Sequence, residues 1–357
     1  MPTLRTSDSP FCIGPFVVKP VLWLLLILCV PAHVQGCLRA DDSGVSSAEQ
    51  LTVYSGRTEA LIGPVLERFE AETGVRVRVQ YAQTAQLAAA LLEEGSRSPA
   101  DVFLAQDAAT MGLLEREGIL DVLPPEILDR VDPRFRSPTG RWVGVSGRAR
   151  VITYHPDRVD ASELPRTLDD LRDPRWHGRL GWAPTNASFQ AAVAAMVAQR
   201  GEHETASWIA ALAAGSPRVY PSNTPAVLAV QAGEVDAVLT NHYYLHRLRA
   251  EQGERITVRN HYLRGGEAGA FLSTSTAAVR AGTTRAEPAH RLIAHLLEHD
   301  AQAHFAAVNF EFPLAVGMPA PEGLPSTESL DAPEIDLGSL HSLETTVRLL
   351  REAGALR

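Results

Sequence analysis

Hydrophobic and polar residues follow two different spacings along this chain, and the order of the spacings indicates the fold class. Residues 75–81 alternate one by one, which is typical of a half-buried strand. Residues 60–73 place apolar side chains three and four apart, as a helix does, and Gly74 ends that pattern. A short apolar run at residues 51–54 precedes them. A strand, a helix and a strand in this order predict a βαβ unit.

The same rhythm of strands and helices continues along the chain. We expect further helices at residues 84–94, 108–117, 188–200, 203–213, 224–233, 245–251 and 287–301. We expect further strands at residues 101–105, 142–146, 150–154, 180–182, 236–240 and 271–279. Strands that alternate with helices predict an α/β fold whose parallel sheets are covered by helices.

Two of the expected strands would carry the chain between two lobes. The strand that begins at Arg150 leads into a second lobe, and the run that begins at Phe271 returns to the first. Two α/β lobes joined by crossing strands predict a hinged clamshell that closes on a small ligand. The expected boundaries are 50–149 with 274–324 for the first lobe and 150–273 with 325–357 for the second.

The start of the chain has the pattern of a secretory signal. The apolar run at residues 21–30 follows Arg5 and Lys19, and it is too short to span a membrane stably. Behind it, the stretch Val34-Gln35-Gly36-Cys37 resembles a bacterial lipobox, in which the cysteine is lipidated and becomes the new N-terminus. The pattern therefore predicts an exported protein.

The lipobox predicts that residues 1–36 are a lipoprotein signal peptide and that Cys37 carries a lipid anchor. Gln35 is not the usual small residue at its position, so plain signal cleavage beside an incidental cysteine stays open. Residues 37–49 are small and polar, which suits a tether. Both alternatives place the protein in the periplasm or on the outer face of the cell membrane.

Composition excludes several classes of protein. A chain of 357 residues, 45% hydrophobic and 21% charged, is long enough for two globular domains, and its net charge of −9 argues against nucleic-acid binding. Its three cysteines and its only lysine, Lys19, all lie within the first 37 residues. The mature chain therefore has no disulfide, no Cys-ligated metal and no Schiff-base lysine. Any ligand must therefore be bound by oxygen and nitrogen atoms, including the guanidinium groups of arginines.

The stretch from Asn241 to Tyr244 is the most unusual in the chain. It follows an apolar strand and opens a helix, so it lies at the carboxyl edge of a sheet, where open α/β folds bind ligands. Phenolate oxygens are hard, anionic ligands that suit Fe(III), and a bound cation would favour ionisation of Tyr243 and Tyr244. Two aromatic residues that cap a core are the alternative interpretation.

At this point the chain resembles the bacterial periplasmic ferric-iron-binding proteins, the solute-binding components of iron(III) ABC transporters. The resemblance extends from Leu51 to Leu314 and rests on several motifs together. These are Val53-Tyr-Ser-Gly-Arg57, Ser98-Pro-Ala-Asp-Val-Phe103, Ser146-Gly-Arg-Ala-Arg-Val151, Gly181-Trp-Ala-Pro-Thr-Asn186, Ala232-Gly-Glu-Val-Asp-Ala237 and Asn241-His-Tyr-Tyr244. The resemblance implies a type II periplasmic-binding-protein clamshell with crossing hinge strands.

The resemblance also implies a ligand set. Tyr243 and Tyr244 fall on the two adjacent tyrosines that ligate Fe(III) in that family, where a synergistic anion, often carbonate or phosphate, completes the coordination. The implied anion pocket consists of Asn186, Ala187, Ser188, Asn223 and Asn241. The first three open a helix, whose free N–H groups suit an anion. A simple helix cap at Asn186 and a turn at Asn223 are the alternatives.

The chain departs from the family pattern at two positions. Better-known members place a histidine and a carboxylate where Thr58 and Gln106 stand here, and neither residue is a good Fe(III) ligand. Glu59 and Asp107 are possible extra ligands, and an exposed charge or a helix cap is the alternative for both.

Two arginines also adjoin the expected site. Arg57 and Arg148 could pair with the anion through their planar guanidinium groups. The histidines elsewhere, such as His290, His295 and His299, are expected on the solvated faces of helices.

The sequence thus predicts a monomeric solute-binding protein, not an enzyme, that delivers Fe(III) and its anion to an ABC permease with its ATPase subunit. It would contact the membrane through its lipid anchor only and would not bind nucleic acid. A binding protein for an anion such as a phosphonate, without iron, stays open as an alternative. A sensor subunit or a surface enzyme is a further one.

Overall fold

The computed structural model describes residues 50–340 and 343–356. The expected signal peptide, the lipid anchor at Cys37 and the tether at 37–49 lie outside the described residues, so they stay predictions.

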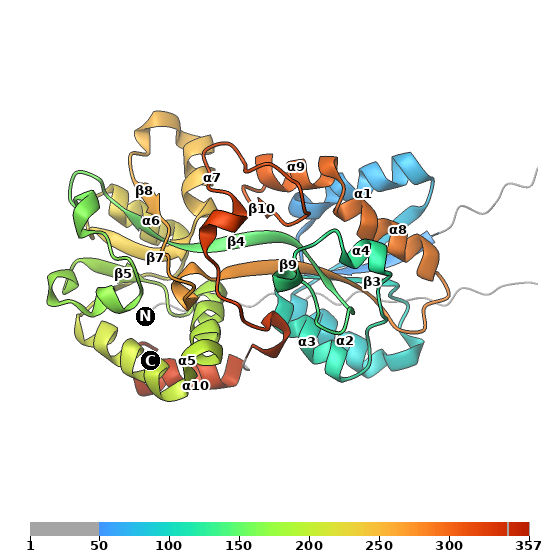
Figure 1. Ribbon diagram of the computed structural model, residues 1–357, viewed down its shortest axis with the longest axis horizontal. Coiled ribbons are helices and arrows are strands. Elements are labelled where there is room, and N and C mark those ends of the chain that lie inside the picture. Colours follow the sequence, from blue (N-terminus) through green and yellow to red (C-terminus); the bar gives the residue numbers. More distant parts are fainter. Residues whose placement is uncertain (1–49, 341–342, 357) are drawn as a thin grey trace, which may run out of the picture. The chain divides into compact units, whose positions relative to one another are not determined.

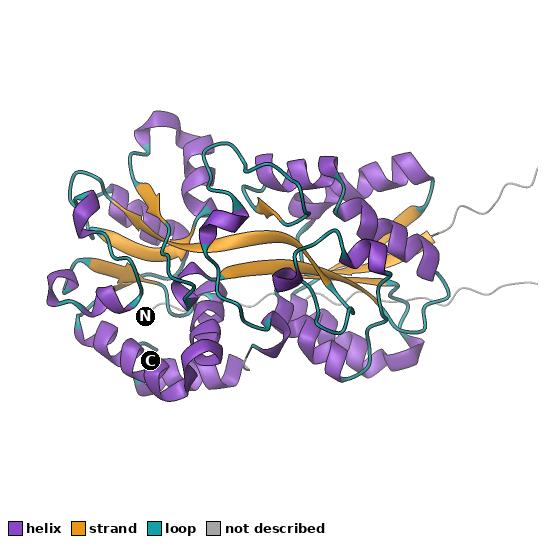
Figure 2. Ribbon diagram, viewed as in Figure 1, coloured by secondary structure: helices purple, strands orange, loops and turns teal. Residues whose placement is uncertain are grey.

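The described chain forms one mixed sheet with helices packed on it (Figures 1 and 2). The strands are β1 (Gln50–Ser55), β2 (Arg76–Tyr81), β3 (Val102–Ala105), β4 (Val143–Tyr154), β5 (Leu180–Trp182), β6 (Arg218–Val219), β7 (Ala237–Asn241), β8 (Arg259–His261), β9 (Leu272–Val279) and β10 (Phe312–Pro313). The helices are α1 (Glu59–Thr73), α2 (Thr84–Glu94), α3 (Ala108–Arg116), α4 (Pro125–Leu128), α5 (Ala187–Ala214), α6 (Asn223–Gln231), α7 (Tyr243–Gln252), α8 (Ala286–Leu296), α9 (His299–Ala307) and α10 (Leu343–Glu352).

The strand order shows two halves that share their central strands. The order is β2-β1-β3-β9-β4-β7-β5-β6, with β8 and β10 attached to β4. β1 pairs in parallel with β2 and β3, and β5 pairs in parallel with β6 and β7, as the βαβ pattern predicts. Both halves are thus α/β layers, each built around its own parallel strands.

The long strand β4 belongs to both halves. Its residues up to Ala149 pair with β9, and its residues from Arg150 onward pair with β7. The sequence predicted two separate strands here, but the structure has one strand with a register shift between Gly144 and Ser146. Gly147 permits the close pairing, because a Cβ atom there would lie 2.8 Å from a methyl group of Leu272.

Two helical predictions differ in detail from the structure. The single helix expected at 287–301 is two helices, α8 and α9, because Glu298 adopts an extended backbone between them (φ −78°, ψ 157°). The two helices expected at 188–200 and 203–213 form one element, α5, that is interrupted where Gly201 takes a positive φ of 82°. Helices α4 and α10 and the short strands β6, β8 and β10 were not predicted.

The segment 325–340, here called the C-terminal strap, contacts both halves of the sheet. Near its middle, the carboxylate of Asp331 accepts hydrogen bonds from the backbone N–H groups of Gly265 (2.6 Å) and Gly266 (3.0 Å), which precede β9. Beyond the strap, α10 packs against α5 of the second half.

Further along, the strap packs on α3 of the first half. A Cβ atom on Gly112 would lie 1.8 Å from the carbonyl oxygen of Gly338, so only glycine permits this contact. The Nη1 atom of Arg116 donates to the same carbonyl at 3.2 Å. Residues 337–339, which the sequence assigned to the second lobe, therefore touch the first.

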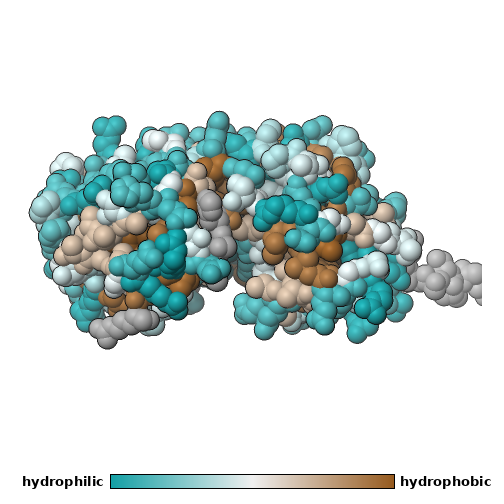
Figure 3. Space-filling model, turned by 90° about the horizontal axis from the view of Figure 1, so that it is seen from below, coloured by the Kyte–Doolittle hydropathy of each residue, from teal (hydrophilic) through white to brown (hydrophobic). Residues whose placement is uncertain are grey.

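Figure 3 shows one face, on which hydrophilic residues surround smaller hydrophobic patches. No described helix is long and apolar enough to cross a membrane.

Candidate functional site

The two tyrosines lie side by side where β7 ends and α7 begins. Strand β7 is buried along its whole length, and the helix starts at Tyr243, one residue after His242. The rings of Tyr243 and Tyr244 stack with their centroids 4.4 Å apart and an angle of 30° between their planes. The strand-to-helix turn thus directs adjacent side chains to the same place.

His242 fixes the backbone that precedes the tyrosine pair. Its ring is fully buried, and its Nδ1 atom accepts a hydrogen bond from the N–H of Ala149 on β4 at 3.2 Å. Burial lowers the pKa of His242 to about 3, which keeps the ring neutral and able to accept. The side chain of Asn260 donates to the His242 carbonyl at 2.8 Å. These bonds tie the start of α7 to strands β4 and β8.

Burial and the neighbouring groups shift the pKa of Tyr243 in opposite directions. Burial raises its pKa above the usual value of 10.0, and the neighbouring Tyr244 raises it further, whereas Arg148 and Arg247 lower it. The guanidinium carbon of Arg247 lies 4.6 Å from the centre of the Tyr243 ring. Without a bound cation the phenol therefore keeps its proton at neutral pH, and a cation that binds there would have to displace that proton.

Arg150 is a site residue that the sequence reasoning missed. It is only 4% exposed, and its Nη1 atom donates to Oδ1 of Asn241 (3.1 Å) and to Oγ of Ser188 (3.2 Å). Burial lowers its pKa to about 10, an effect that the two nearby tyrosines oppose. Arg150 remains a cation at neutral pH. Its spacing from Arg148 could have revealed it. Residues two apart on a strand share a face, and Arg148 was already a candidate.

The expected anion-pocket residues converge in the structure. Asn186 caps α5, with its Oδ1 atom accepting from the Ser188 N–H at 3.0 Å. The Nδ2 atom of Asn223 donates to Asn186 (3.2 Å) and to Ser188 (3.1 Å). Ala187 is the first residue of α5, and Asn241 joins the group through Arg150. Asn186 thus makes the capping hydrogen bond that the cap interpretation expects. This bond is compatible with an anion bound at the same helix end.

Asn223 stands out within this group. It is fully buried, and its Oδ1 atom has no hydrogen-bond partner among the described residues. It opens α6. A buried amide without a partner for one of its atoms is costly, so the position favours contact with a ligand or water.

Arg57 lies in a buried ion pair. Its Nη2 atom is 2.9 Å from Oε2 of Glu311, and both side chains are at most 3% exposed. Its Nη1 atom contacts Ser275 and lies 3.4 Å from the hydroxyl of Ser146. Burial opposes the ionisation of Glu311, but Arg57 and Arg148 outweigh it and hold the pKa of that carboxyl below its usual value. The charge of Arg57 is thus already neutralised by a residue that sequence reasoning did not single out.

Gln106 holds Arg148 in place. Its Oε1 atom accepts from Nη1 of Arg148 at 3.2 Å, and its backbone carbonyl accepts from Nη2. Ser273 on β9 lies 3.3 Å from the same guanidinium. Arg148 is therefore fixed beside the tyrosine pair, where it lowers the pKa of Tyr243.

The remaining candidates lie at helix starts. Thr58 is the residue before α1 and is exposed, and its side chain makes no capping hydrogen bond. Glu59 is the first residue of α1 and is also exposed. Asp107 precedes α3, and its Oδ1 atom accepts from the Thr110 N–H at 2.8 Å. The cap interpretation of Asp107 therefore has a contact that supports it.

We expect Asp107 to act as a helix cap and not as a metal ligand. Asp107→Ala should lower the free energy of unfolding by about 1 kcal/mol, because a helix cap is lost. Asp107→Asn should leave stability nearly unchanged, because asparagine caps equally well. Neither variant should alter metal affinity. Urea unfolding and metal titration of both variants measure this, and a loss of affinity in Asp107→Asn would identify a ligand instead of a cap.

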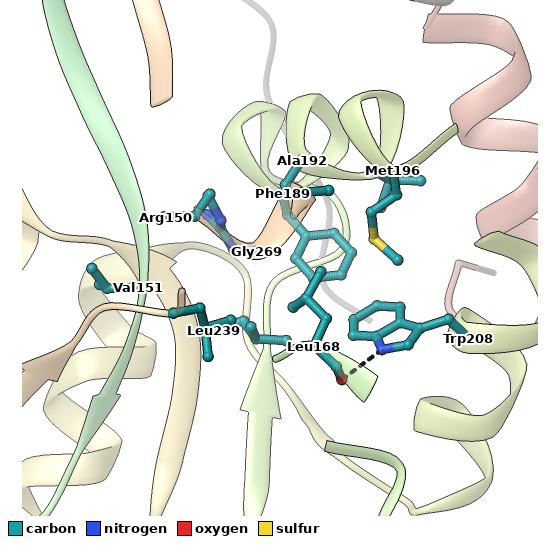
Figure 4. A pocket seen from close by; sticks show the side chains of 12 residues that line it. Arg150, Val151, Leu168, Phe189, Ala192, Met196, Trp208, Leu239 and Gly269 are labelled. Carbon is teal, nitrogen blue, oxygen red and sulfur yellow. Dashed lines mark hydrogen bonds between the residues drawn. The ribbon is translucent and has the colours of Figure 1, made fainter. Parts of the chain in front are cut away.

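A small cavity lies behind Arg150 in the second half (Figure 4). Its volume is about 20 Å³, and apart from Arg150 it is lined by apolar residues such as Phe189, Met196 and Leu239. That volume is close to the space one water molecule needs, so the cavity does not fit a larger ligand. The cavity belongs to the core, and Arg150 separates it from the hydrogen-bonded group that contains Ser188 and Asn241.

Comparison of the sequence with known proteins shows the family of this chain. Residues 97–336 match the family model described as bacterial extracellular solute-binding protein. The chain belongs to this family. Its members are solute-binding proteins.

Relatives across nearly the whole chain carry names that refer to ferric iron. The Fe(3+)-binding periplasmic protein of Serratia marcescens is 32% identical over 320 residues, which cover 89% of this chain and 94% of the relative. The major ferric iron-binding protein of Neisseria meningitidis (serogroup A) is 32% identical over 308 residues, 85% of this chain and 92% of the relative. The family resemblance predicted from the motifs is confirmed.

A solved structure agrees with the fold. The iron-bound HitA from Pseudomonas aeruginosa is 34% identical, with a TM-score of 0.76 over 86% of this chain and 99% of that chain. The predicted fold class, a two-lobed type II periplasmic-binding protein, is confirmed.

Proposed function

We propose that this protein captures Fe(III) outside the cytoplasm through the phenolate oxygens of Tyr243 and Tyr244. The observation that carries the proposal is the stacked pair itself, placed at the end of a buried strand with cations on several sides. Arg148 and Arg247 favour the phenolate form of Tyr243. Phenolates are hard, anionic donors, so they prefer a hard trivalent cation.

A small oxyanion, carbonate or phosphate, completes the coordination in this proposal. With Thr58 and Gln106 in place of a histidine and a carboxylate, the tyrosine pair supplies the anionic ligands from the protein. The anion would lie at the start of α5, near Ser188, Arg150 and Asn223. Hydrogen-bond donors and a helix N-terminus suit a bound oxyanion there.

The proposed task of the protein is delivery, not catalysis. The ligand would stabilise the closed lobes by binding them more tightly than the open ones. A membrane permease with an ATPase subunit would recognise the closed form and accept the iron. The lipid anchor at Cys37 would keep a monomer at the membrane surface. The family to which the chain belongs consists of solute-binding proteins, which supports this task.

Titration of the purified protein with Fe(III)-citrate in carbonate and in phosphate buffer tests this function. We expect a visible absorption band from tyrosinate-to-iron charge transfer that saturates at one iron per chain. Buffer exchange from carbonate to phosphate should shift the band, because the anion is a ligand. A saturating iron site without this band would contradict ligation by tyrosine.

An anion-binding protein without iron is the second candidate. Two observations favour it. The site contains two cations, Arg148 and Arg150, that could bind an anion. Thr58 is exposed and is not a good Fe(III) ligand. In that case calorimetry would detect phosphonate or phosphate binding in metal-free buffer, and iron would produce no band.

A further inference from the structure

A cluster of possible metal ligands lies on the first half of the sheet, away from the tyrosine pair. It consists of Glu72, His295 and Glu298, here called the Glu-His-Glu cluster, whose ligand atoms all lie within 4.8 Å of one another. Glu72 is near the end of α1, His295 is in the last turn of α8, and Glu298 precedes α9. Figure 1 shows α1, α8 and α9 close together.

The expectation that His295 lies on a solvated helix face is wrong. The residue is only 5% exposed, and its ring packs edge-on against Phe69 with the centroids 5.5 Å apart. Its Nδ1 atom is directed between the two carboxylates, 3.5 Å from Glu72 and 3.4 Å from Glu298. A buried imidazole thus has one nitrogen directed towards two acidic groups.

The two distances from His295 Nδ1 to the carboxylates are longer than ordinary hydrogen bonds and are compatible with shared ligation of one ion. An N–H···O hydrogen bond has a length of about 2.7–3.2 Å, which is shorter than both contacts. Ligands of a tetrahedral ion with bonds of about 2.0–2.1 Å are separated by about 3.3–3.4 Å, the edge of the tetrahedron. The two separations from His295 Nδ1, 3.5 Å and 3.4 Å, are close to that edge.

The surroundings leave the cluster accessible. Both glutamate side chains are 51% exposed, so an ion can enter and a water molecule can fill a fourth position. Arg68 is a neighbouring cation, 3.6 Å from Oε1 of Glu72, and it also pairs with Asp300 at 3.1 Å. The other oxygen of Glu72 is the one that faces His295.

We propose that the Glu-His-Glu cluster binds a divalent first-row metal ion such as Zn²⁺, with water as the fourth ligand. One imidazole and two carboxylates form a donor set that Zn²⁺ accepts. The site is separate from the tyrosine pair, because its residues lie on α1, on α8 and just before α9 in the first half of the sheet, whereas Tyr243 and Tyr244 follow β7 in the second half. The bound ion would join the end of α1 to the junction of α8 and α9.

One feature limits the affinity. The Nε2 atom of His295 has no hydrogen-bond partner among the residues the structure describes. Metal-bound histidines usually donate this second N–H to a partner, and its loss weakens binding about 10- to 100-fold. We therefore expect micromolar instead of nanomolar affinity for Zn²⁺.

Calorimetric titration with ZnCl₂ tests the proposal. The purified exported protein, without a polyhistidine tag, should carry Tyr243→Phe and Tyr244→Phe so that the proposed iron site does not contribute. We expect one saturable Zn²⁺ per chain and a higher Tm with Zn²⁺ than with Mg²⁺. Adding Glu298→Gln or His295→Gln should remove both effects. Glu287→Gln is the matched control, because it removes one exposed carboxylate from α8 and should change neither.

The outcomes separate this proposal from the iron function. Glu298 is exposed, so Glu298→Gln should fold even if His295→Gln does not. Absence of saturable Zn²⁺ binding in the parent protein would overturn the proposal, as would binding that persists unchanged in Glu298→Gln. Neither result depends on the tyrosine pair, because that pair is removed in every variant compared.

Discussion

Replacing Tyr243 with phenylalanine is expected to abolish useful binding of ferric iron. The change removes one of the two anionic protein ligands in the proposed site and leaves the ring in place. Loss of a residue that only hydrogen-bonds to a metal ligand already lowers metal affinity about 10- to 100-fold. Loss of a ligand itself should therefore lower the affinity by more than about 100-fold. The charge-transfer band should weaken or vanish. Competition titration against citrate, followed by absorbance, measures both effects.

Tyr262→Phe is the matched control for this prediction. Tyr262 is another largely buried tyrosine, and it lies beyond β8, where its ring meets Phe312 edge-on at 6.5 Å. Its hydroxyl has no hydrogen-bond partner in the described part of the chain, so its removal should be nearly neutral. Equal iron affinity in Tyr243→Phe and Tyr262→Phe would show that the tyrosine pair is not the iron site.

The second large effect is expected at the buried ion pair. Glu311→Gln keeps the shape of the side chain but leaves the Arg57 cation without its counter-charge at a place that is 2% exposed. Removal of one partner from a buried ion pair costs about 3–5 kcal/mol, because the remaining charge stays desolvated. We expect the free energy of unfolding to fall by that amount. Urea unfolding followed by circular dichroism measures it.

A double variant distinguishes the ion pair from simple packing. Arg57→Met together with Glu311→Gln removes both charges, so it should recover most of the stability lost in Glu311→Gln. A decrease below about 1 kcal/mol in Glu311→Gln would mean that water reaches Arg57 and screens its charge. No recovery in the double variant would mean that the loss comes from packing around Glu311.

Local sequence patterns predicted most elements but not the contacts that build the site. The helix at 84–94 and the strand at 180–182 have the predicted bounds, because their apolar spacing and end signals agree. The break at Glu298 was missed, since the apolar spacing of the expected helix continues across it. The three-residue strand β8 was missed because so short a segment carries almost no periodic signal.

The missed site residues depend on distant parts of the chain. Glu311 becomes important only through Arg57, which lies 254 residues earlier. Arg150 acquires its role from Asn241, 91 residues later. Burial and pairing of this kind are set by tertiary packing, which no local pattern contains. The tyrosine pair was predictable because its placement depends only on a strand that ends and a helix that begins.

The C-terminal strap constrains how a clamshell of this kind can move. Two adjacent connections, such as β4 and β9, leave a body free to rotate about the line through them. The strap adds a third connection, anchored at Gly265 on one side and at Gly112 on the other. A rotation that separated these anchors would have to break the Asp331 hydrogen bonds or the close backbone contact between Gly112 and Gly338. The amplitude of opening, and with it the rate at which a bound ion escapes, is then set partly by residues that never touch the ligand.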